Sequence, residues 1–194
     1  MMVRKIILIG KGLLVSVLLA GCATTEVVPE NDRQVAFVTV HHAILHIPVS
    51  ATYRWSDGFM QQSEANVIKN VPMHRLLKQG IEQEMQRKGY RQVPQTEQAD
   101  INISFAAALT SALDDRQIQE KYGLVPGLMV NPLNPKRYEK GTLIFDVLNP
   151  QTNKLAWRTA GQALASLEEI PLQERKARIK VFIKKLLAFL PEKE

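Results

Sequence analysis

Apolar and polar residues alternate along several segments of this chain, which is typical of β-strands with one buried face. The clearest alternation covers residues 101–109, where Ile, Ile, Phe, Ala and Leu take every second position. Residues 35–55 are rich in Val, Ile, Thr and aromatic residues, and they predict two short strands or one strand broken near Pro48. Residues 142–148 and 154–166 predict two more strands, and the turn residues between them predict a hairpin.

Helical periodicity marks two longer segments. In residues 72–88, apolar residues recur every four positions, with proline at the start and Gly89 just past the end. Residues 172–190 carry a second apolar stripe, and Pro191 ends it. Asp114 is a candidate cap for a short helix carrying Ile118 and Tyr122, whereas residues 123–140 are expected to be irregular.

The order of these elements predicts the fold class. Strands joined by a tight turn favour a largely antiparallel sheet, and two one-faced helices would cover one side of it. We therefore expect an α+β two-layer sandwich, with about 4–6 strands and two main helices on one face. A single domain over residues 34–194 would hold this fold.

The N-terminus has the features of an export signal. Arg4, Lys5 and Lys11 precede or flank an apolar run that is too short to span a membrane. Residues 18–22 read Leu-Leu-Ala-Gly-Cys, which resembles the lipobox of bacterial lipoproteins. The resemblance implies cleavage before Cys22, a diacylglycerol on its thiol and an acyl chain on its new amine. Residues 1–21 would then be the signal and residues 22–33 a lipidated tether.

The same resemblance also suggests a location. Thr24 lies where aspartate marks retention in the inner membrane, so we expect a lipid anchor in the periplasmic leaflet of the outer membrane. Half of the formal net charge of +6 comes from the three cations of the signal, so charge gives no argument for a nucleic-acid partner. Cys22 is the only cysteine, and its lipidation would leave no thiol for a disulfide, a metal or redox chemistry.

The predicted hairpin also resembles a known sequence pattern. Residues 141–146 read Gly-Thr-Leu-Ile-Phe-Asp, and residues 154–158 read Lys-Leu-Ala-Trp-Arg. These residues resemble a family of bacterial envelope lipoproteins of unknown function, and the likeness extends from about Tyr53 to Pro191. The chain departs from that pattern at Asn149, where aspartate is usual, and at Thr159, where glycine is usual. The family brings no known substrate or catalytic residue, so nothing catalytic carries over from the resemblance. We expect a binding or scaffolding role in the periplasm, without a cofactor, rather than an enzyme.

The residues themselves suggest few sites of chemistry. His41, His42 and His46 form the one histidine cluster in the sequence, and whether they converge is open. We favour surface or edge-strand histidines over a metal site, because zinc needs three or four convergent ligands. Signatures of hydrolytic nucleophiles, phosphate loops and metalloproteases are absent. An envelope hydrolase with a cryptic site and a small-molecule or metal carrier remain as alternatives.

Three surfaces are candidates for contacts with a partner. Residues 123–130 form an apolar stretch within the irregular segment, which either inserts into a partner, a ligand groove or lipid or packs on the sheet. We expect Leu124, Leu128 and Met129 to contact an envelope partner. For Trp157 and Arg158 we favour a core tryptophan with the arginine on the opposite face over a stacking platform. The basic residues of 172–190 either lie on a membrane or, as we favour, form the solvated side of a helix that covers the sheet.

Overall fold

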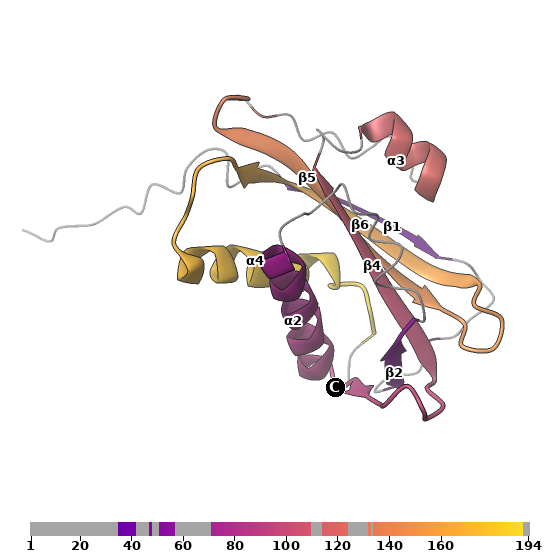
Figure 1. Ribbon diagram of the computed structural model, residues 1–194. Coiled ribbons are helices and arrows are strands. Elements are labelled where there is room, and N and C mark those ends of the chain that lie inside the picture. The colour runs from indigo at the N-terminus through magenta and orange to yellow at the C-terminus, as the bar shows by residue number, and fades with distance from the viewer. Residues whose placement is uncertain are drawn as a thin grey trace, which may run out of the picture.

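A computed structural model describes residues 35–41, 47, 51–56, 71–109, 114–123, 132 and 134–191. In these residues, six strands form one open sheet, and helices pack on both of its faces (Figure 1). The strands are β1 (Val35–His41), β2 (Thr52–Trp55), β3 (Arg91–Gln92), β4 (Ile101–Leu109), β5 (Tyr138–Leu148) and β6 (Leu155–Ser166). The helices are α2 (Val71–Arg87), α3 (Asp115–Tyr122) and α4 (Leu172–Leu186). The predicted α+β sandwich is confirmed.

The sheet is mixed but largely antiparallel. Its strand order is β1-β6-β5-β4-β2-β3, and the pairs β1–β6, β6–β5 and β5–β4 are antiparallel. The short strand β2 pairs in parallel with both β4 and β3, and α2 forms the connection from β2 to β3. The predicted hairpin is confirmed as β5–β6, although β5 begins at Tyr138, inside the segment expected to be irregular.

One carboxylate fixes the parallel strand β2 beside β4. The backbone N–H and the hydroxyl of Thr52 both donate to Asp100 Oδ2 at 2.7 Å. These two hydrogen bonds stabilise the charged carboxylate, so they lower the pKa of Asp100 below its usual value. The pair Ala99-Asp100, which opens β4, thus has a structural role in aligning the two strands.

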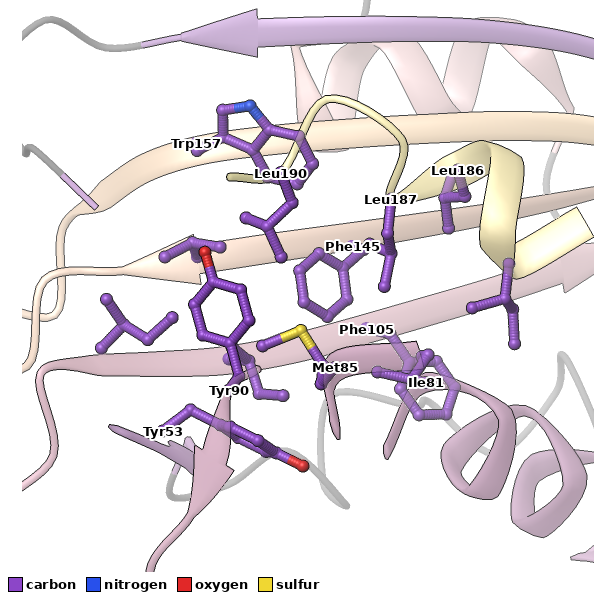
Figure 2. Packing of buried hydrophobic residues seen from close by; sticks show 14 of the residues in the cluster. Tyr53, Ile81, Met85, Tyr90, Phe105, Phe145, Trp157, Leu186, Leu187 and Leu190 are labelled. Atoms are coloured by element: carbon purple, nitrogen blue, oxygen red, sulfur yellow. The ribbon is translucent and has the colours of Figure 1, made fainter. Parts of the chain in front are cut away.

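The main core lies between the sheet and the helices α2 and α4 (Figure 2). Alternate residues of β2, β4, β5 and β6 point toward these helices, which supply Ile81, Met85 and Ile183 to the same cluster. The helices approach closely at Gly80, where a Cβ atom would lie 2.6 Å from Ile183 Cδ1. The two main helices therefore cover one face of the sheet, as expected.

Helix α4 ends at Leu186, one turn before the predicted end at Leu190. The buried Lys88, which follows α2, donates from Nζ to the carbonyl of Leu190 at 2.8 Å and to that of Ala188 at 3.5 Å. The chain turns after α4 so that these carbonyls meet the ammonium group, while Leu187 and Leu190 stay in the core. The end of the predicted apolar stripe therefore does pack in the core, but the prediction that its last turn is helical is wrong.

A β-bulge shifts the register near the hairpin turn. Leu155 pairs with Leu148, whereas Trp157 pairs with the neighbouring residue Val147. Consecutive residues of β5 point to opposite faces, so Leu155 and Trp157 lie opposite residues of different faces. Ala156 is thus the extra residue of β6, and the regular alternation of the strand is interrupted there.

Candidate functional site

Most of the site residues proposed from the sequence lie outside the described residues. This holds for Cys22, for the apolar trio Leu124, Leu128 and Met129, and for His42 and His46. The backbone of His41 forms the last residue of β1, opposite Trp157. Among the residues that the structure describes, no group of three His, Cys, Asp or Glu side chains is arranged to hold a metal ion. What the structure adds is the geometry of α3, which directly precedes the apolar trio.

Helix α3 forms where the sequence predicted it, and both of its ends are fixed locally. Asp114 accepts a hydrogen bond from the backbone N–H of Gln117 at 2.8 Å, and the Gln117 side chain accepts one from the N–H of Asp114. At the other end, Gly123 has φ of 65°, and its N–H donates to the carbonyl of Gln119. A helix of eight residues is marginal alone, so its stability depends on the sheet beneath it.

Helix α3 covers the sheet face opposite to α2 and α4 (Figure 1). Its buried side chain is Ile118, which packs with Ile144 of β5 and Ala160 of β6 in a small second cluster. This cluster is much smaller than the main core, so apolar packing alone holds α3 weakly. Polar contacts at both ends of the helix supply the remaining attachment of α3 to the sheet.

At the first turn of α3, Asp115 joins two strands. Its carboxylate forms an ion pair with Lys140 of β5 and accepts a hydrogen bond from Gln162 of β6 at 3.0 Å. Gln162 also donates to the Thr142 hydroxyl at 3.2 Å. Lys140, Thr142 and Gln162 are all buried, so these contacts satisfy polar groups that α3 shields from water.

At the last turn of α3, Arg158 has the same role with more contacts. Asp146 and Arg158 are paired residues of the hairpin, and they form two parallel hydrogen bonds of 2.6 Å. Arg158 also donates to the carbonyl of Tyr122, and its guanidinium lies 5.5 Å from the centre of the Tyr122 ring. Both charged side chains are only 14% exposed.

The favoured interpretation of Trp157 and Arg158 agrees with this geometry. Trp157 is 1% exposed in the main core, and Arg158 points to the opposite face. The local order of residues in the hairpin does not by itself predict that its aspartate and arginine bind each other and hold α3. The hairpin register could have revealed the pair, because Asp146 and Arg158 lie at matching distances from the turn, apart from the bulge.

The contacts of Asp115 and Arg158 fix the two ends of α3, and Gly123 is the last described residue before the apolar segment. Gly123 follows Tyr122 beside the Asp146–Arg158 pair, and the described chain resumes at Pro132 and Asn134 before β5 begins at Tyr138. Asp146 and Tyr138 are separated by eight residues of strand, or about 26 Å. In chemical terms, the arrangement holds α3 and its end at Gly123 by bonding charged groups to one another.

A comparison with known protein families places this chain in one of them. A family model, described as a domain of unknown function (DUF4136), matches residues 32–192. The chain belongs to the DUF4136 family. The family description names no activity, and a search of curated proteins found no significant match.

A comparison with solved structures also finds chains that are similar to this DUF4136 domain. One is the PelC dodecamer from Paraburkholderia phytofirmans, with 8% identity and a TM-score of 0.49, which covers 83% of this chain and 100% of that one. Another is a PDZ domain protein from Parabacteroides distasonis, with 13% identity and a TM-score of 0.45, which covers 82% of this chain and 37% of that one. Likeness at this level carries no argument about function.

Proposed function

We propose that this protein is a lipoprotein of the outer membrane, anchored in the periplasmic leaflet, that acts without catalysis as a binding or scaffolding module. The observation that carries the proposal is the stretch Leu-Leu-Ala-Gly-Cys at residues 18–22, after a short apolar run and the cations Arg4, Lys5 and Lys11. Acyl chains contribute about 0.8 kcal/mol per buried methylene, so two or more chains on Cys22 form a stable anchor. In the part of the chain that the structure describes, no helix has the length and apolar character of a transmembrane span.

The binding role in this proposal belongs to the segment with Leu124, Leu128 and Met129. The geometry of α3 supports it, because a capped helix with an ion pair at its first turn and Arg158 at its last turn holds the start of the segment in place. A contact element held on a rigid scaffold loses less conformational entropy on binding than a free chain does. The partner in this proposal is another protein of the cell envelope.

The anchor is tested by Cys22→Ser. Because serine offers no thiol for the thioether, we expect the variant to stay as an unprocessed precursor without lipid, and to be lost from outer-membrane fractions. Fractionation and the mass of the N-terminal peptide measure both effects. Normal processing of the variant together with normal outer-membrane fractionation would contradict the anchor.

The binding segment is tested by changing Leu124, Leu128 and Met129 to serine together. We expect crosslinks to envelope proteins to disappear in cells, while the melting temperature changes little, because a contact element is not part of the core. Changing the exposed residues Leu167 and Leu172 to serine is the control, and it should leave the crosslinks intact. A large drop in melting temperature for the triple variant would show instead that the segment packs in the core.

A further inference from the structure

The exposed apolar side chains of this protein gather around one helix. Among the described residues, the large apolar side chains that are most exposed are Leu167 at 54%, Leu172 at 53%, Val181 at 56% and Phe189 at 72%. All four lie in α4 or in the few residues on either side of it. Because the apolar stripe of α4 already faces the core, these exposed groups belong to its outer side or to its ends.

The positive charge of the protein is concentrated on the same helix. Helix α4 carries six cationic residues and one acidic residue, Glu174, whose carboxylate binds Arg178 at 2.8 Å. Ala177, Val181 and Lys184 follow one another at spacings of four and three residues, so they share one side of the helix, and all three are exposed. Lys180 and Lys185 are also exposed on this outer side. The outward face of α4 is therefore basic, with an apolar residue among the lysines.

The position of α4 relates this face to the N-terminal anchor. Phe182 of α4 packs on Phe37 of β1 with ring centres 5.4 Å apart, directly over Gly161, where a Cβ atom would lie 2.7 Å from either ring. Strand β1 begins at Val35, so the described domain starts on the same strand that α4 contacts. About a dozen residues separate Val35 from Cys22, and a flexible chain of that length has an average end-to-end distance of about 20 Å. A lipid on Cys22 would hold α4 close to the membrane surface.

We propose that the outward face of α4 docks on a membrane surface rich in anionic phospholipids. The inference rests on the proposed lipid anchor, and it adds an orientation to it. The lysines meet the phosphate groups, and Val181 enters the headgroup region. Since α3 covers the other face of the sheet, this orientation turns α3 and Gly123, where the apolar segment starts, away from the membrane and toward partners in the periplasm (Figure 1).

Spin labels on the full-length acylated protein in lipid vesicles test this docking. Acylation blocks Cys22, the only cysteine, so Ala177→Cys gives a single labelling site on the outer side of α4, and Thr152→Cys gives a control label at the hairpin turn. The vesicles contain phosphatidylethanolamine with phosphatidylglycerol, or phosphatidylcholine alone. We expect the Ala177 label to lose accessibility to a water-soluble nickel complex only in the anionic vesicles at low salt, whereas the Thr152 label stays accessible in all of them.

Charge variants in the Ala177→Cys background provide the matched comparison. Changing Lys180, Lys184 and Lys185 to glutamine should restore full nickel accessibility, whereas changing the exposed cations Arg116, Lys136 and Lys154 to glutamine should not. A label at Ala177 that stays as accessible as the label at Thr152, in protein whose acylation is verified by mass, would overturn the docking and leave the anchor standing. Labelling of Cys22 itself would instead show that the anchor is missing. If the lysine variant loses protein crosslinks while the label stays in water, an acidic protein surface is the partner and the proposal is wrong.

Discussion

Replacing Trp157 with alanine should lower the free energy of unfolding by about 3–5 kcal/mol, because the change removes a large buried side chain and leaves a cavity. Trp157 is 1% exposed, and its ring packs edge-on against Phe145 with centres 6.1 Å apart (Figure 2). The two rings lie in the middle of the main core, between β5, β6 and the end of α4, so the surroundings cannot collapse easily to fill the space. Urea unfolding measures the loss through the midpoint and the slope.

A second substitution separates packing from recognition. Trp157→Phe keeps part of the ring volume and should lose clearly less stability than Trp157→Ala. Trp55, the other tryptophan, remains in both variants as a fluorescence probe of the same core. Unchanged stability of Trp157→Ala together with a loss of partner crosslinks would make Trp157 a recognition residue, contrary to its position in the structure.

The elements with strong local periodicity were predictable from the sequence. Strand β4 covers the residues whose alternation predicted it, and α2 differs from the predicted helix by one residue at each end. In these segments one face is buried along the whole element, so the order of apolar residues alone determines the structure. Helix α3 was predictable for a different reason, since Asp114 caps it and Gly123 ends it through local hydrogen bonds.

The features that depend on distant residues were not predictable. Helix α4 ends early because Lys88, about a hundred residues away in sequence, binds the carbonyls that follow it. Strand β5 starts at Tyr138 because that residue pairs with Ser166 at the end of β6. The parallel pairing of β2 depends on contacts with β3 and β4 that no local pattern encodes. Thr159 forms a hydrogen bond with Thr39 of β1 at 3.2 Å, which is again a contact between distant strands.

The candidate site shows the same division between local and distant information. Apolar composition marked Leu124, Leu128 and Met129 as a possible contact element, and their role stays a prediction. The polar contacts that hold α3 were missed, because each joins residues from separate elements, such as Asp115 with Gln162. Only the Asp146–Arg158 pair was within reach of sequence reasoning, through the hairpin register.

Asp146→Ala should lower the free energy of unfolding by about 3 kcal/mol, because it leaves the Arg158 guanidinium in a nearly buried position without its carboxylate partner. The double variant with Asp146 and Arg158 both changed to leucine should recover much of this loss, since it removes both charges and fills the space with apolar groups. Urea unfolding of Asp146→Leu, Arg158→Leu and the double variant forms a double-mutant cycle that gives the coupling energy of the pair.

Arg158→Leu should in addition release the last turn of α3, because Arg158 alone of the pair binds the Tyr122 carbonyl. Hydrogen exchange at the amides of residues 119–123 should then be faster in Arg158→Leu than in Asp146→Ala, when both are measured under conditions that give them the same global stability. Exchange in β4 should not differ between the two variants. Equal exchange at residues 119–123 would show that Ile118 and the Asp115 contacts hold α3 without Arg158. If the expected difference appears, Arg158→Leu should also weaken crosslinks to envelope proteins, although it leaves Leu124, Leu128 and Met129 unchanged. The reason is that these residues would then lose the fixed point from which their segment begins.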